Sequence, residues 1–133
     1  AENDYLLGTH DDEIRRLGLQ HRVWRSHAAG TWSRAGFREG QTIVDLGCGP
    51  GYASIELAEI VGPSGRVVAI DRSRRFMDRL EAERRRRELP QIEILEADLD
   101  GPLPAGAADG LWCRWAAAFV RDPQRLVGRT AAP

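Results

Sequence analysis

The chain has 133 residues and a formal net charge of −1. Its length suits one domain with a hydrophobic core. A near-neutral chain has no general electrostatic attraction to nucleic acid, and the sequence lacks the long apolar run of a membrane span. The two cysteines, Cys48 and Cys113, are too few for a disulfide framework, so we expect a protein of the reducing cytoplasm.

The first predicted element is helical. Thr9 is followed three residues later by Asp12, a partial helix-start signal, and apolar or aromatic side chains then recur at helical spacing. We expect one or two helices over residues 11–35, ended by Gly36. The positions that set this spacing are Ile14, Leu17, His21 and Trp24.

A strand, a tight turn and a helix follow. Residues 43–46 form a short apolar run that stops at a glycine-rich turn, and residues 52–61 have a helical pattern that Gly62 breaks. Residues 67–70 are continuously apolar, as in a strand buried on both faces of a parallel sheet. Asp71 stands at the carboxyl end of this second strand.

Ser73 is a candidate cap for the next helix, whose apolar positions are Phe76, Met77 and Leu80. Further strands are predicted over 92–95 and 110–113, and a last helix over 123–130. This alternation indicates an α/β fold, a Rossmann-like doubly wound parallel sheet within a single domain.

The turn between the first strand and its helix contains Gly47, Gly49 and Gly51. Ligands of doubly wound sheets bind at the carboxyl ends of the strands, and glycine there allows a sharp turn and close approach of a ligand. A purely structural turn is the alternative. A dinucleotide motif, G-x-G-x-x-G, requires its third glycine at position 52, which is Tyr52.

Residues 44–51, with Asp45 before the three glycines, resemble the first motif of class I S-adenosylmethionine-dependent methyltransferases. The resemblance implies S-adenosylmethionine as cofactor, with Asp45 supporting its methionine end directly or through water. The negative charge of Asp45 suits this cofactor, because S-adenosylmethionine carries an ammonium and a sulfonium and no pyrophosphate.

The resemblance also assigns positions at later strand ends. Asp71 would accept hydrogen bonds from both ribose hydroxyls, unless it only caps a helix, and Arg72 would cover the adenine unless it is merely solvated. Asp98 would take the adenine amino group, and Leu99 would meet the ring through its backbone amide. The cofactor-binding positions implied are Asp45, Gly47, Cys48, Gly49, Gly51, Asp71, Arg72, Asp98, Leu99 and, through its carbonyl to the methionine ammonium, Arg114.

No catalytic residue is assigned. In related small-molecule enzymes the segment that precedes the core folds over the cofactor, so we expect a helical cap or lid over residues 1–40 and a cofactor-binding core over 41–133.

Any histidine of that cap is a candidate base, although His21 fits a packed, hydrogen-bonded position. The aromatic side chains there wall the ligand or belong to the core. These histidines are His10, His21 and His27, and the aromatic residues are Tyr5, Trp24 and Trp32. No His/Cys cluster suggests a metal.

Four consecutive arginines, residues 84–87, resemble a nucleic-acid patch at first sight. Glutamates flank them at salt-bridge spacing, so we interpret the run as a solvated helix face and expect no nucleic-acid or membrane partner.

The resemblance stops after the helix that follows the fourth strand, whereas the family continues with a fifth strand and an antiparallel pair. The fourth strand would then be an open edge. We therefore expect a truncated chain whose missing C-terminal half covers that edge, or a homo-oligomer or second chain that does so.

The function predicted is S-adenosylmethionine-dependent methyl transfer to an O, N or C nucleophile of a small molecule. One alternative is a cofactor-binding fragment or regulatory half that needs another chain for activity. A second alternative, an NAD-dependent oxidoreductase, is disfavoured by Tyr52 and Asp45.

Overall fold

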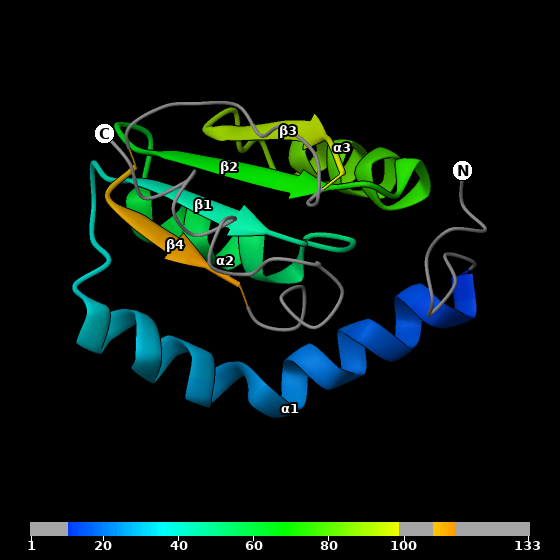
Figure 1. Ribbon diagram of the computed structural model, residues 1–133, viewed down its shortest axis with the longest axis horizontal. Coiled ribbons are helices and arrows are strands. Elements are labelled where there is room, and N and C mark those ends of the chain that lie inside the picture. The colour runs from blue at the N-terminus through cyan, green and yellow to red at the C-terminus, as the bar shows by residue number, and fades with distance from the viewer. Residues whose placement is uncertain (1–10, 99–107, 114–133) are drawn as a thin grey trace.

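A parallel sheet of four strands organises the computed structural model, which describes residues 11–98 and 108–113. In Figure 1 the four arrows point the same way, in the order β3-β2-β1-β4. The order reverses between β1 and β4, and this reversal is where doubly wound sheets bind ligands. The predicted α/β fold is confirmed. The strands are β1 (Thr42–Leu46), β2 (Arg66–Asp71), β3 (Ile92–Glu96) and β4 (Gly110–Trp112).

Three helices cover one face of this sheet: α1 (Asp11–Ala35), α2 (Tyr52–Val61) and α3 (Arg74–Arg86). Alternate strand residues point to opposite faces. The side facing the helices carries Ile43, Val67, Ala69 and Ile92, and the other side carries Val44, Leu46, Val68 and Ile70. The predicted helix over 123–130 lies outside the described residues.

The long helix α1 is the predicted 11–35 segment, formed as one helix, and it runs along the β4 side of the sheet (Figure 1). Trp32 is buried in the core, where its ring meets that of Trp112 edge-on at 5.3 Å between centroids. Near the other end, Ile14 packs against Phe76 and Met77 of α3. Helix α1 is thus anchored at both ends.

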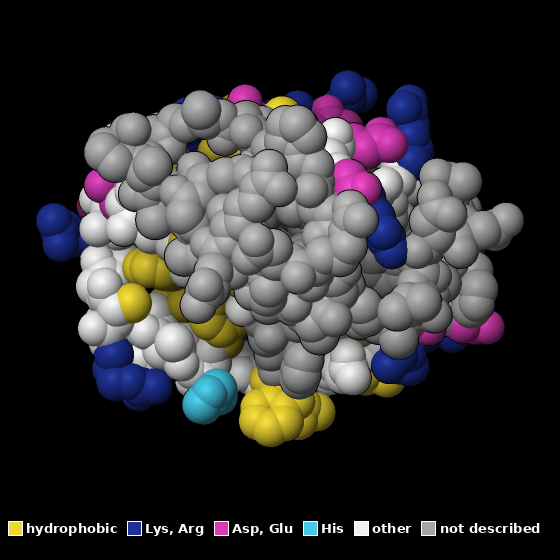
Figure 2. Space-filling model, in the orientation of Figure 1, with side chains coloured by type: hydrophobic (Ala, Val, Ile, Leu, Met, Phe, Trp, Pro, Cys, Tyr) yellow, Lys and Arg dark blue, Asp and Glu magenta, His cyan; other side chains and the backbone are white. Residues whose placement is uncertain are grey.

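Trp24 departs from the core assignment that its helical spacing favoured. Its side chain is 46% exposed, and its ring lies edge-on to His27, with 6.1 Å between centroids. Leu19 and Val23 are also exposed. Hydrophobic side chains accordingly project at the lower margin of Figure 2, where α1 lies. The buried side of α1 is therefore narrower than the predicted stripe.

The four arginines of residues 84–87 are paired with glutamates. Arg84 and Arg85 contact Glu81, while Arg86 and Arg87 contact Glu83. The interpretation as a salt-bridged helix face is confirmed. Among the described residues, no helix is long and apolar enough to cross a membrane.

Ser73 begins α3 as predicted, because its Oγ accepts a hydrogen bond from the Phe76 N–H at 3.2 Å. Replacing Ser73 with alanine removes the side-chain cap of α3, and we expect the free energy of unfolding to fall by about 1 kcal/mol. Urea unfolding followed by circular dichroism measures the change. Ser73→Thr keeps a capping hydroxyl without adding a charge beside Asp71, so a loss of the same size in both variants would contradict the capping role.

Candidate functional site

The glycine turn joins β1 to α2 at the carboxyl edge of the sheet. Gly47, Gly49 and Gly51 have φ values of 65°, 58° and 93°, a region that side chains other than glycine rarely adopt. The backbone N–H groups of Gly47 and Cys48 both donate to the Ile70 carbonyl, at 2.7 and 3.0 Å. The turn is therefore held against the end of β2.

Two glycines of this turn have different surroundings. At Gly51 a Cβ would lie 2.3 Å from Cδ1 of the buried Leu80, so close packing with α3 excludes a side chain. At Gly49 a Cβ would meet no atom within 4 Å, although the residue is buried. Open space thus borders the backbone of Gly49, as the approach of a ligand to a glycine requires.

Asp45, inside β1, is almost completely buried, with 2% exposure. Its Oδ2 accepts a hydrogen bond of 2.6 Å from the hydroxyl of Ser54, a fully buried residue of α2. Burial raises the pKa of Asp45 to about 7, the Ser54 hydrogen bond opposes this rise, and the nearby Asp71 charge adds to it. A cation beside this carboxyl would favour its ionised form.

Asp71, at the end of β2, connects two turns. Its Oδ2 accepts the N–H of Gly49 at 2.9 Å, and its Oδ1 accepts the N–H of Ser73 at 3.0 Å. Burial raises the pKa of Asp71, and the hydrogen bonds from these backbone groups work against that rise. Ser73 caps α3, so the alternative in which Asp71 merely caps a helix does not describe its contacts.

Sequence reasoning placed further residues at this site. Cys48 lies in the turn as a free thiol, half-buried, and burial is the main cause that raises its pKa. Arg72 is half-buried beside Asp71, where its charge helps to lower the pKa of that carboxyl. Asp98 is exposed, two residues beyond β3. Leu99 and Arg114 lie outside the described residues. Within the described ranges, no His, Cys, Asp and Glu side chains gather in a metal-binding group.

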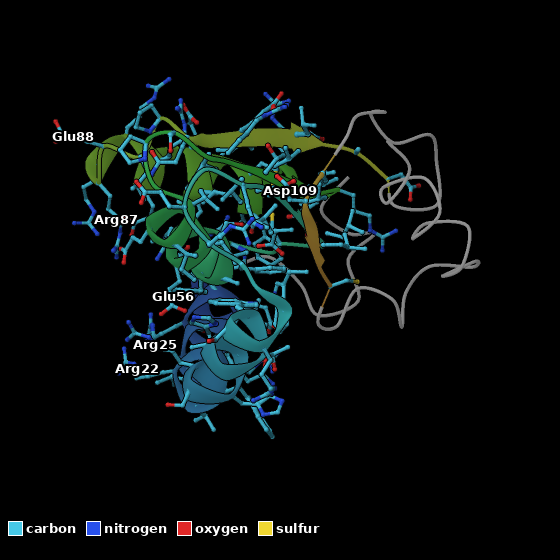
Figure 3. The ribbon with its side chains drawn as sticks, turned by 90° about the vertical axis from the view of Figure 1, so that its left-hand side faces the viewer. Arg22, Arg25, Glu56, Arg87, Glu88 and Asp109 are labelled. Atoms are coloured by element: carbon cyan, nitrogen blue, oxygen red, sulfur yellow. The ribbon has the colours of Figure 1, made fainter. Side chains whose placement is uncertain are left out.

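His21 belongs to the interface between α1 and α2. Its Nε2 lies 2.8 Å from Oε2 of Glu56, which also contacts Arg25. These side chains line a groove of about 360 Å³ between the two helices, on the side where Figure 3 labels Arg22, Arg25, Glu56 and Arg87. The prediction that His21 is packed and hydrogen-bonded is confirmed. His27 is exposed, and His10 and Tyr5 lie outside the described residues.

Ser54 is the site residue that sequence reasoning missed. It occupies a buried position of α2 together with Leu57, Ala58 and Val61. A hydroxyl at a core position of an amphipathic helix needs a hydrogen-bond partner, and this requirement is the signal that would have pointed to it.

The chemistry of these residues fits S-adenosylmethionine. Two buried carboxyls, Asp45 and Asp71, flank a glycine turn that borders open space at Gly49. Buried carboxylates attract a cation, and a carboxylate has lone pairs for two neighbouring hydroxyls in addition to backbone donors. An acid at the position of Asp71 suits the ribose of either cofactor, whereas the Asp45 carboxylate would repel the pyrophosphate of a dinucleotide.

Comparison with solved structures agrees with this fold. The structure of a SAM-dependent methyltransferase from Aquifex aeolicus superposes with a TM-score of 0.70 at 25% sequence identity. The match covers 79% of this chain and 58% of that chain. The Aquifex aeolicus structure has a Rossmann-like fold, in agreement with the strand order β3-β2-β1-β4 of this chain.

Two curated relatives are similar in sequence. The demethylmenaquinone methyltransferase of Lactococcus lactis is 37% identical over 79 residues, 59% of this chain. The trans-aconitate 2-methyltransferase of Azoarcus is 33% identical over 95 residues, 71% of this chain. The chain spans 30% and 35% of the length of these two proteins.

A family model described as "Methyltransferase domain" matches residues 43–131. This range includes the glycine turn, Ser54 and Asp71. The chain therefore belongs to the methyltransferase domain family, whose S-adenosylmethionine-dependent members share its fold.

Proposed function

We propose that this chain binds S-adenosylmethionine at the glycine turn and supports methyl transfer to an O, N or C nucleophile of a small molecule. The observation that carries the proposal is the pair of buried carboxyls, Asp45 just before the glycine turn and Asp71 bonded to the Gly49 N–H, at a turn whose backbone borders open space at Gly49. Membership of the methyltransferase domain family supports the same reading.

Each residue of the turn has a role in this proposal. Asp45 stabilises the cationic methionine end, Gly49 lets the ligand approach the backbone, and Asp71 accepts the ribose hydroxyls while it holds the turn through the Gly49 N–H. Gly47, Cys48 and Gly51 shape the turn. The adenine contacts of Arg72, Asp98 and Leu99, and the carbonyl contact of Arg114, rest on the family resemblance.

The cofactor supplies a methyl group already activated on a sulfonium. The chain's own residues are left to bind and orient it, and to keep water away from the reacting atoms. Proximity and orientation of this kind contribute roughly 7–11 kcal/mol to a rate enhancement. No base is required unless the acceptor must lose a proton, so the proposal needs no catalytic side chain.

A small-molecule acceptor is the substrate class that the relatives favour. The names of the two relatives specify demethylmenaquinone and trans-aconitate. We also propose that residues 1–40 form a cap segment beside the core at 41–133. In support, Ile14 of α1 packs with Phe76 and Met77, in a cluster that includes the half-buried Cys48 of the turn.

Transfer of a tritiated methyl group from S-adenosylmethionine tests the activity. The full chain is incubated with demethylmenaquinone, trans-aconitate and a panel of small phenols, amines and carboxylates, and we expect a labelled product from at least one acceptor. An Asp45→Asn, Asp71→Asn double variant is the matched control and should give none. Tight cofactor binding without transfer to any acceptor would instead favour a regulatory half that depends on another chain.

A further inference from the structure

We infer that Ser54 is a positioning residue for the cofactor: its hydroxyl orients the Asp45 carboxyl group and favours its ionised form, and cofactor binding completes the ionisation by releasing the remaining proton. The inference rests on the proposed function, because it concerns the same site. It adds a residue outside the glycine motif and a pH dependence of binding.

The geometry of the pair supports this role. Ser54 is the third residue of α2, and its hydroxyl donates to Oδ2 of Asp45 at 2.6 Å. Ser54 is fully buried and Asp45 is 2% exposed, so water competes little for the bond. A short hydrogen bond in such surroundings fixes the plane of the carboxyl group and stabilises its charged form.

The other groups that act on Asp45 make its charge costly. Asp71 at the end of β2 and the thiol of Cys48 in the turn are its titratable neighbours. The charge of Arg72 acts on Asp71, where it opposes the rise in pKa that burial causes. In the neighbouring strand β4, Trp112 is paired in register with Asp45. Helix α2 contributes the Ser54 hydroxyl. Ser54 is thus the contact that opposes burial and the Asp71 charge.

The direction of the pH effect follows from these contacts. Burial raises the pKa of Asp45 to about 7, so at neutral pH the unliganded protein carries a proton there part of the time. A bound ammonium or sulfonium favours the carboxylate and lowers that pKa, so affinity rises as pH increases through about 7 and is lost as pH falls below it. Binding at pH 7 should release roughly half a proton.

Isothermal titration calorimetry of S-adenosylmethionine into the full chain tests this linkage. Titrations between about pH 6 and 9, in buffers of different ionisation enthalpy, give both the affinity and the number of protons released. In Ser54→Ala the carboxylate loses its donor, and we expect the midpoint of the affinity curve to move up by about one pH unit and the affinity at pH 7 to fall about fivefold. Asp45→Asn should remove the part of the pH dependence that has its midpoint near pH 7.

Two further variants separate this role from a structural one. Ser73→Ala removes another buried serine hydroxyl that does not contact Asp45, and it should leave the midpoint unchanged. Ser54→Cys keeps nearly the same size with a weaker donor, so it should give an intermediate midpoint, and it replaces Ser54→Ala if alanine prevents folding.

The outcomes distinguish the two proposals. If the unmodified chain does not bind S-adenosylmethionine, the proposed function fails. If it binds, but Ser54→Ala and Ser54→Cys keep the original midpoint, or no proton is released near pH 7, then the role of Ser54 is wrong and the proposed function stands.

Discussion

Replacing Gly51 with alanine is expected to lower the free energy of unfolding by about 2–5 kcal/mol, since overpacking and the left-handed backbone conformation both add cost. The residue has a φ of 93°, and a Cβ would lie 2.3 Å from Cδ1 of Leu80. Leu80 is fully buried, so it has little room to move aside. Urea unfolding monitored by circular dichroism gives the loss directly.

Gly49→Ala is the matched control for this result. It shares the positive φ, at 58°, but its Cβ would extend into open space. Gly49→Ala should lower the free energy of unfolding by about 1–2 kcal/mol, the cost of the left-handed backbone conformation alone. Equal losses in the two variants would show that contact with Leu80 does not constrain the turn.

The second large effect is expected at Asp71. In Asp71→Ala the ribose hydroxyls lose their acceptor, and the affinity for S-adenosylmethionine should fall by about 1–3 kcal/mol, or roughly 5- to 150-fold. The same change leaves the buried N–H groups of Gly49 and Ser73 without their acceptor. Stability should therefore fall together with affinity, and calorimetry with urea unfolding measures the two effects.

Ser73→Ala serves as the control for Asp71→Ala, because it destabilises the start of α3 without removing an acceptor from the proposed ribose site. We expect it to bind the cofactor like the unmodified chain at concentrations where both are folded. If Asp71→Ala also binds normally, Asp71 holds the turn but does not contact the ribose.

Sequence reasoning reached the elements that local signals define. Helix α1 spans 11–35 and ends before Gly36, and α2 spans 52–61 and ends before Gly62, because a positive φ at each glycine closes the helix. The strand β2 was recognisable because a strand buried on both faces is continuously apolar, as residues 67–70 are. Each predicted strand differs from the observed one by a single residue at one or both ends, which is the usual ambiguity of element ends.

Long-range contacts were harder to predict. The bonds from Ser54 to Asp45 and from His21 to Glu56 depend on how α2 packs on the sheet and on α1, and nothing at those positions specifies the partner. Trp24 was misjudged for the same reason, since helical spacing gives a direction from the axis but not how far the neighbouring elements reach.

The most direct test of the cofactor assignment is calorimetric titration of the full chain with S-adenosylmethionine and, separately, with NAD⁺ at pH 7.5. The two buried acids predict saturable binding of S-adenosylmethionine, weakened in Asp71→Ala, while the Asp45 carboxylate and Tyr52 in place of a third dinucleotide glycine predict no measurable heat with NAD⁺. Binding of NAD⁺ without S-adenosylmethionine would contradict the assignment.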